Sequence, residues 1–478
     1  MKRLLPIVTV HLLFLVSPSF ASGGIDFTIH KLESDRSGNT LLVIGGIQGD
    51  EPGGFNAAAL LATQYRIKKG NVWVVPNLNF ISIIKRSRGV YGDLNRKFAH
   101  IGRSDPEYHT ISKVKTIILD DRVDLILNLH DGSGFYRPTY VDHAHNQHRW
   151  GQSIIIDQEQ IEAVPFGELG ELAKEVTAVV NRHLFSEEHV YHVKNTLTKL
   201  GDTEMAKTLT YYAVRNLKPA FGVEVSKSFP THKRAYYHLR VLEAFMDLLG
   251  IEYERSFGLS ASGVKEAIYN DVKLAFYDNR IFLDVANARK RLGYLPLRKS
   301  AEIVYRPSNP LIALVESNDG FRVFHGNRRI TRIHPQYFEY DFSAENIAVQ
   351  VDGEVRKAAF GDMLGVQESF MIMPKEGYRV NVIGFKKQGT SDESGVMIGQ
   401  KDIIKRFSVD KSGNIFRVEV YKEDKFSGMV LVNFSEERDN LIASESSNLS
   451  LFGLSAKQKA SFAKDSPAKA GKGTHLGR

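Results

Sequence analysis

Cysteine is absent from all 478 residues of the chain. This absence excludes a thiol nucleophile, a thiolate metal cluster and any disulfide bond. A metal site in this chain must therefore use histidine, carboxylate or amide ligands. Long apolar runs are also missing, because no stretch reaches the roughly 20 residues that a membrane-spanning helix needs.

The chain has little net charge once its two ends are set apart. Lys and Arg outnumber Asp and Glu by 63 to 55, which gives a formal net charge of +8. Five of these positive charges belong to residues 456–478, and Lys2 and Arg3 supply two more. The rest of the chain is nearly neutral, so we expect no basic face for nucleic acid.

The N-terminus has the pattern of a secretory signal peptide. Lys2 and Arg3 precede an apolar run at 4–16, and Ser19 and Ala21 are small residues at the positions a signal peptidase requires. We predict a cleavable signal peptide over residues 1–21 and export to the periplasm. The apolar run is too short to span a bilayer, so an integral membrane protein is not expected.

The rest of the chain divides into regions with different sequence patterns. Residues 22–250 alternate apolar strand-like runs with helical segments, which predicts an α/β domain with a mixed sheet flanked by helices. Short β-rich runs follow, and they predict two small all-β sandwich-like domains at 251–335 and 336–440, the second immunoglobulin-like. Ser, Ala, Lys and Gly dominate 441–478, which predicts a disordered basic tail.

Polar side chains follow the predicted strands of the first domain. Gln48 and Glu51 come after a strand at 41–44 and lie three residues apart, so both can converge on one ion at the start of a helix. His130 follows a strand at 125–129. Ligands of an open parallel sheet gather at the carboxyl ends of its strands, which favours a site here. A polar turn and a hydrogen-bonded histidine are the commoner uses of such residues.

Glu224 and a group of donors complete the candidate site. Glu224 lies in an otherwise apolar strand, where an ionisable group is costly unless it is paired or functional. Arg86, Arg88, Asn95 and Arg96 offer guanidinium and amide donors of the kind that bind carboxylates. A solvated basic loop has the same composition.

The order of these residues resembles that of the funnelin-type zinc metallocarboxypeptidases: Gln48 and Glu51, Arg88, Asn95 and Arg96, His130, and Glu224. The whole chain is most similar to the cell-shape-determining DL-carboxypeptidases of helical bacteria. That subgroup appends two small β-domains, trims peptidoglycan peptides, and has glutamine where the wider family has a histidine ligand.

The resemblance implies roles for the motif residues. One Zn²⁺ per chain would be held by Gln48, Glu51 and His130, with an open position for water. Glu224 would act as general base and then as general acid, and Arg88 would polarise the scissile carbonyl. Asn95 and Arg96 would bind the terminal carboxylate. The expected substrate-binding residues are Arg86, Asn95, Arg96, Trp150, Thr210 and Lys227.

The resemblance also implies a function. The enzyme would trim muramyl tripeptide to dipeptide with release of meso-diaminopimelate and so influence cell shape, with cell-shape protein partners reached through the β-domains. Two alternatives stay open: a zinc deacylase of the aspartoacylase type, and a noncatalytic peptidoglycan-binding or scaffold protein in which Gln48 marks a decayed site. The export signal disfavours the first, and the retention of Glu51, His130 and Glu224 disfavours the second.

Overall fold

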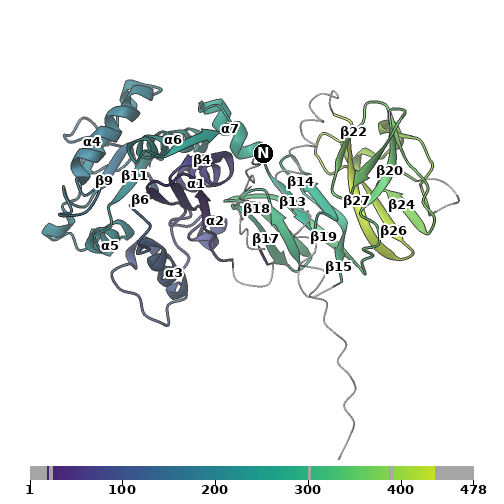
Figure 1. Ribbon diagram of the computed structural model, residues 1–478, viewed down its shortest axis with the longest axis horizontal. Helices are drawn as coiled ribbons and strands as arrows, with labels where there is room; N and C mark the ends of the chain where they lie inside the picture. The colour runs from purple at the N-terminus through teal and green to yellow at the C-terminus, as the bar shows by residue number, and fades with distance from the viewer. Residues whose placement is uncertain (1–18, 21–24, 300–302, 387–388, 390, 436–478) are drawn as a thin grey trace, which may run out of the picture. The chain divides into compact units, whose positions relative to one another are not determined.

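The structure is a computed structural model that describes most of the chain between residues 25 and 435 (Figure 1). The described residues are 19–20, 25–299, 303–386, 389 and 391–435. The predicted signal peptide, apart from Ser19 and Phe20, and the predicted basic tail lie outside them. The chain divides into two compact units, Met1–Tyr340 with Val409–Ser412, and Asp341–Ser408 with Gly413–Arg478.

A seven-stranded mixed sheet forms the centre of the first unit. The strands, in sheet order, are β10 (His192–Asn195), β9 (Ser153–Ile156), β11 (Ala220–Ser226), β6 (Leu125–Gly132), β3 (Thr40–Ile44), β5 (Asn71–Val75) and β2 (His30–Glu33). Pairs β10–β9, β11–β6, β6–β3 and β3–β5 run parallel, whereas β9–β11 and β5–β2 run antiparallel. The predicted mixed sheet flanked by helices is confirmed.

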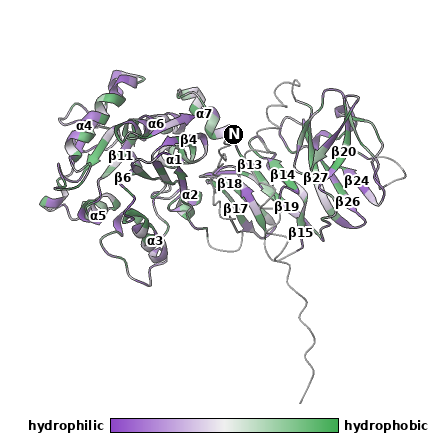
Figure 2. Cartoon of the chain, viewed as in Figure 1, coloured by the Kyte–Doolittle hydropathy of each residue, from purple (hydrophilic) through white to green (hydrophobic). Residues whose placement is uncertain are grey.

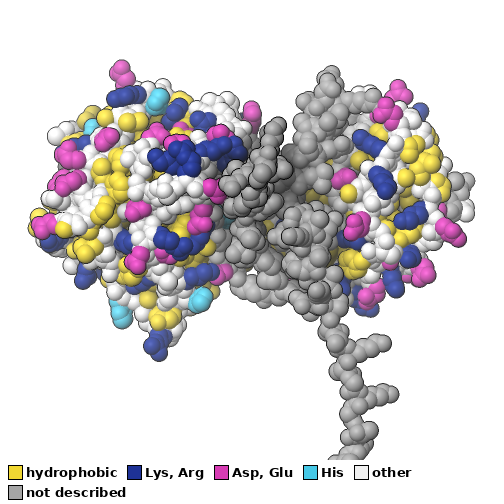
Figure 3. Space-filling view, viewed as in Figure 1, with side chains coloured by type: hydrophobic (Ala, Val, Ile, Leu, Met, Phe, Trp, Pro, Cys, Tyr) yellow, Lys and Arg dark blue, Asp and Glu magenta, His cyan; other side chains and the backbone are white. Residues whose placement is uncertain are grey.

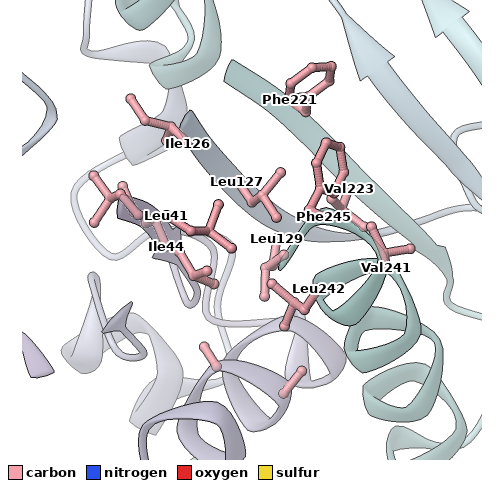
Figure 4. Close-up of a cluster of buried hydrophobic side chains, with 14 of the residues drawn as sticks. Leu41, Ile44, Ile126, Leu127, Leu129, Phe221, Val223, Val241, Leu242 and Phe245 are labelled. Atoms are coloured by element: carbon pink, nitrogen blue, oxygen red, sulfur yellow. The ribbon is translucent and has the colours of Figure 1, made fainter. Parts of the chain in front are cut away.

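Helices cover this sheet. They are α1 (Pro52–Gln64), α2 (Phe80–Lys85), α3 (Tyr108–Ile118), α4 (Leu169–Val180), α5 (Leu209–Arg215), α6 (Thr231–Leu248) and α7 (Ala261–Asn270). On one face, Phe221 and Val223 of β11 pack against Phe245 and Val241 of α6 (Figure 4). Because side chains alternate along a strand, Glu224 faces the other side of the sheet, where α5 contacts β6 and β11.

The structure extends two sequence-based expectations. Strand β6 continues to Gly132, so His130 lies within the strand rather than after it. The α/β layer also continues past residue 250, where a domain boundary is predicted. Strand β12 (Glu252–Arg255) pairs with β4 (Tyr65–Lys69), and α7 packs against α6 through its buried residues Val264 and Ile268.

The first unit also contains two four-stranded β-sheets. They confirm that β-strands dominate after the α/β layer, as the sequence predicts. One contains β1 (Ser19–Phe20), β16 (Val304–Pro307), β13 (Lys273–Phe276) and β14 (Ile281–Asp284). The other contains β15 (Leu292–Arg298), β19 (Arg328–Phe338), β18 (Gly320–His325) and β17 (Ile312–Ser317). Strand β19 runs through Pro335, so the chain leaves this unit only after Tyr340.

The second unit consists of two four-stranded sheets that share one apolar core. The first contains β21 (Glu354–Ala359), β20 (Asn346–Val351), β23 (Ser369–Ile372) and β25 (Ile398–Gly399). The second contains β22 (Met363–Gly365), β27 (Lys425–Asn433), β26 (Ile415–Lys422) and β24 (Tyr378–Val382). The apolar run of β27 is green in Figure 2.

The surface agrees with the charge balance of the sequence. On the face shown in Figure 3, basic and acidic side chains are interspersed over the described residues. Within the described part of the chain, no helix is long and apolar enough to cross a membrane.

Candidate active site

Three metal-type donors converge between β6 and the start of α1. Glu51 is the residue that precedes α1, Gln48 lies in the turn before it, and His130 is in β6. His130 Nδ1 is 2.9 Å from Glu51 Oε2 and 3.2 Å from Gln48 Oε1. All three side chains are buried. Donor atoms this close around one point can share a cation.

Asp93 fixes the orientation of the Gln48 amide. Gln48 Nε2 donates to Asp93 Oδ1 at 2.8 Å, which leaves the amide oxygen directed at His130. Arg88 donates to the other carboxylate oxygen of Asp93 at 2.9 Å. Burial alone would raise the pKa of Asp93, but Gln48 and Arg88 outweigh burial and hold it below its usual range. Asp93 was not predicted, although it is an acid within a basic cluster.

Asp131, the residue after His130 in β6, stabilises the segments that carry these donors. Its backbone N–H donates to Glu51 Oε2 at 3.2 Å, and its buried carboxylate accepts from Gly53 N at 2.8 Å. Arg234 and His238 of α6 lie 3.0 and 3.1 Å from the same carboxylate. Arg234 also donates to two carbonyls in the turn after β11. This network, which was not predicted, joins the segments that carry Glu51, the β6 histidine and the end of β11.

Glu224 lies on β11, where it is in register with His130 of the neighbouring strand β6. Its Oε2 is buried and has no hydrogen-bond partner among the described residues. A Cβ at Gly132 would lie 2.7 Å from this oxygen, so only glycine leaves room for the carboxylate. Burial, reinforced by the Glu51 and Asp131 carboxylates and opposed by His130, raises the pKa of Glu224 to about 7. Such a carboxylate can exchange a proton near neutral pH.

Cationic and amide donors line the cavity beside Glu51 and His130. An Arg88 guanidinium nitrogen is 3.8 Å from Glu51 Oε1, and the Asn95 side-chain nitrogen is 3.4 Å from His130 Nε2. Arg96 is partly buried, and its guanidinium donates to the Asn95 carbonyl at 3.2 Å. These groups can bind a carboxylate or a developing oxyanion beside the three converging donors.

The rim carries an aromatic residue and further polar groups. Lys194 Nζ lies 3.9 Å from the centre of the Trp150 ring, and burial lowers the pKa of this lysine to about 8. Lys227 donates to Asp50 at 3.1 Å. Thr210, on α5, is buried at the floor. Trp150, Lys227 and Thr210 are among the residues that line a cavity of about 270 Å³, and Lys194 lies behind Trp150 outside this lining.

Comparison with known proteins identifies the family. Residues 9–269 match a family described as the catalytic part of a carboxypeptidase controlling helical cell shape. The chain belongs to this family. Residues 340–435 match the C-terminal domain of metallo-carboxypeptidases. The chain is therefore a metallo-carboxypeptidase, and its family requires a metal ion.

Solved structures agree with this assignment. Apo Cell Shape Determinant protein Csd4 from Helicobacter pylori is 38% identical, with a TM-score of 0.78 over 85% of this chain and 100% of that chain. Tripeptide-bound Csd4 gives 39%, 0.78, 85% and 100% for the same measures. The mDAP-bound form, described as a D,L-carboxypeptidase, gives 38%, 0.78, 84% and 99%. No curated protein sequence matches the chain.

The cavity of this family member brings together nearly all of the predicted site residues. Those that line it are Gln48, Glu51, Arg88, Asn95, Arg96, His130, Trp150, Thr210, Glu224 and Lys227. Arg86 is the exception. It ends α2 in a left-handed conformation (φ 55°), and its Nε donates to the Asn327 carbonyl at 2.7 Å, so it is not among the lining residues.

The residues of the metallo-carboxypeptidase cavity fit a metal ion. Among the described residues, no three His, Cys, Asp or Glu side chains form a metal-binding group. The third donor near Glu51 and His130 is the amide oxygen of Gln48, which Asp93 turns inward. Two oxygens and one imidazole nitrogen leave a coordination position open, as in catalytic zinc sites.

Proposed function

We propose that the chain is a zinc-dependent DL-carboxypeptidase that trims peptidoglycan muramyl tripeptide to dipeptide and releases meso-diaminopimelate. The observation that carries this proposal is the cavity itself. It holds three converging metal-type donors, a partnerless buried glutamate and two adjacent donors for a carboxylate. The tripeptide and mDAP in the titles of the Csd4 structures support the choice of substrate.

The metal would be held by Gln48, Glu51 and His130. A bound Zn²⁺ supplies Lewis-acid chemistry: it lowers the pKa of a water and polarises a carbonyl. Asp93 and Asp131 keep two of these ligands, Gln48 and Glu51, in place through hydrogen bonds.

Glu224 moves the proton. Its carboxylate takes a proton from the attacking water and delivers it to the leaving amine, and a pKa near neutrality suits both transfers. Arg88 lies 3.8 Å from Glu51 Oε1, and its guanidinium stabilises the charge that develops on the scissile carbonyl oxygen.

Asn95 and Arg96 restrict attack to the last peptide bond. They are neighbours at the cavity wall, and together they offer amide and guanidinium donors to one terminal carboxylate. A substrate without that carboxylate loses its anchor, which makes the enzyme an exopeptidase rather than an endopeptidase.

A peptidoglycan substrate supports a periplasmic location for the enzyme. We expect the predicted leader over residues 1–21 to direct export, and the β-rich regions after residue 270 to offer surfaces for cell-shape protein partners. Cell fractionation of a full-length fusion, with a variant lacking the leader as its control, tests the location.

Mass spectrometry of purified sacculus peptides tests the activity. Incubation with the zinc-loaded protein should convert tripeptide to dipeptide and free diaminopimelate, and the Glu224→Gln variant should leave tripeptide intact. Release of an acyl group would favour a deacylase of the aspartoacylase type. Binding of sacculi without any product would favour a noncatalytic scaffold protein.

A further inference from the structure

Asp157 is a buried carboxylate behind the active-site cavity: it is not itself a lining residue, but Thr210, which interacts with it, and Ile155 are, and the catalytic roles leave it unused. It directly follows β9, and none of its surface is exposed. Ile155, two residues earlier, lines the cavity. Because side chains alternate along an extended chain, Asp157 lies on the same face of the sheet as Ile155, one step farther along.

The sheet register places Asp157 in line with the catalytic glutamate. Strands β9 and β11 are antiparallel, with Ser153 opposite Glu224 and Ile155 opposite Gly222. Gly222 has no side chain to fill the space over Ile155, and it lines the cavity. The floor therefore runs from Glu224 over Gly222 toward Asp157, a path of about 13 Å for four residues at roughly 3.3 Å each.

Hydroxyl groups surround the Asp157 carboxylate. Thr196 and Thr198 donate to its Oδ1 at 3.3 and 2.5 Å. Thr210, which lines the cavity, also directs its hydroxyl at this carboxylate. Thr208 is the next hydroxyl along the cavity wall, with its oxygen 3.2 Å from that of Thr210.

No cation in the described part of the chain balances this carboxylate. Its second oxygen, Oδ2, is buried and has no hydrogen-bond partner among the described residues. The nearest charged influence is another acid, Asp202, and burial raises the pKa of Asp157. A primary ammonium has three N–H donors and no acceptor, so it complements one free carboxylate oxygen flanked by threonine hydroxyls.

We infer that Asp157, with Thr210 and Thr208, forms the far end of the subsite for the leaving residue and binds a primary ammonium on that residue's side chain. The inference rests on the proposed carboxypeptidase function and adds its specificity. Terminal residues of the lysine or diaminopimelate type carry such a group. Residues with a neutral or anionic side-chain end do not.

A purely structural role is the alternative. Asp157 also accepts through its backbone carbonyl from Thr198 N at 3.0 Å, and so helps to fix the segment that leads to α5. An anchor of this kind would affect every substrate equally, whereas an ammonium-binding group discriminates between substrates that differ only in that ammonium.

Two tripeptides and one isosteric variant separate these roles. The first peptide ends in meso-diaminopimelate, and the second ends in 2-aminopimelate, which lacks only the distal amine. For Asp157→Asn we expect kcat/KM on the first peptide to fall by about 10-fold or more, the range of a charge-assisted hydrogen bond, mainly through KM. On the second peptide we expect a change of less than about 2-fold. The variant Thr210→Val should reduce the same preference by a smaller factor.

Glu243→Gln is the matched control. Glu243 is a buried acid of α6 that pairs with Tyr65 and Arg255 away from the cavity, so this change should lower stability and leave the preference between the peptides intact. Equal losses on both peptides in Asp157→Asn and Thr210→Val overturn the inference and leave the carboxypeptidase function standing. Failure of the unaltered enzyme to cleave either peptide overturns the function, and the inference with it.

Discussion

Two buried glutamates in the middle of strands have opposite surroundings. Glu419, in β26 of the second unit, accepts a hydrogen bond from the Tyr421 hydroxyl at 2.7 Å and lies 3.4 Å from an Arg417 nitrogen. Glu224, in β11 of the first unit, has a cavity at its side and two further carboxylates near it. Burial raises the pKa of both glutamates.

The difference shows what marks a functional acid. The charge of Glu419 is balanced by Arg417 of the same strand, so we assign this buried glutamate a structural role in the second unit. The charge of Glu224 is opposed by Glu51 and Asp131 and relieved mainly by His130, which is itself a candidate metal ligand. A buried glutamate therefore indicates chemistry when the fold leaves it without a fixed partner on a cavity.

Replacing each glutamate by glutamine gives the sharpest contrast. Glu224→Gln should lower kcat by about two to four orders of magnitude, the contribution of a general base, while bound zinc stays equimolar. Glu419→Gln should change kcat by less than about 2-fold, since this residue belongs to the other compact unit and is not among the residues that line the cavity. Steady-state kinetics with metal analysis measures both. An active Glu224→Gln enzyme would remove this residue from the mechanism.

Two arginines offer the next contrast. Arg96→Ala should lower kcat/KM on the tripeptide by about 10²-fold through the loss of a charge-assisted pair with the terminal carboxylate. Arg86→Ala should have little effect, because its guanidinium binds the Asn327 carbonyl outside the cavity lining. Amidating the terminal carboxylate should reproduce the Arg96→Ala loss in the unaltered enzyme. Equal cleavage of free and amidated peptides would point to an endopeptidase.

Substitution of the amide ligand Gln48 is expected to have a smaller effect than substitution of the general base Glu224. Gln48→Ala should weaken zinc by about 10- to 100-fold, and Asp131→Asn by a smaller factor in the same direction, because the groups that orient ligands also tune affinity. Gln48→His should retain activity, since imidazole is a favoured zinc ligand. Competition with a chromogenic chelator measures these affinities. Unchanged affinity in Gln48→Ala would assign Gln48 to a polar turn.

The pH profile tests the charge state of Glu224. Only the carboxylate accepts a proton, so kcat/KM should fall about tenfold per pH unit on the acid side of its pKa. The pKa of Glu224 is about 7 in the metal-free chain, and a bound cation favours the charged form, so the acid limb should lie at or below that pH. An acid limb well above pH 7 would contradict this assignment.

The smallest effect is expected on stability. Glu419→Gln removes the charge opposite Arg417 in the sandwich core and should cost about 1–3 kcal/mol of unfolding free energy. Glu224→Gln should cost less, or even stabilise the fold, because it neutralises a charge without a fixed partner. Urea denaturation of the two variants compares them, and a larger loss for Glu224→Gln would reverse the comparison.

Local sequence patterns predict much of this fold and site. The cores of β3, β6 and β11 are apolar runs, which is why these strands and the polar residues in or after them could be predicted. Strand β10 and helix α5 were among the elements not predicted. Strand β10 is only partly buried, and α5 has seven residues, so neither has a strong periodic pattern.

The missed site residues have a different cause. Asp93 and Asp131 act through contacts with segments far away in the sequence, such as Gln48 and Arg234. No spacing along the chain records these contacts. The predicted role of Arg86 has the opposite problem, because it rested on closeness in sequence to Arg88. Arg86 ends α2 in a left-handed conformation, and its side chain is directed away from the cavity.

The residue at position 132 can distinguish active relatives from relatives that have lost activity. A Cβ at Gly132 would meet the Trp150 side chain at 2.6 Å and the Glu224 carboxylate at 2.7 Å, and none of its three nearest atoms belongs to the metal donors Gln48, Glu51 and His130. A relative that keeps every chemical group of the site but replaces this glycine should bind zinc and sacculi without cleaving them. Gene surveys that count only ligands and the base would mistake such pseudoenzymes for active trimming enzymes.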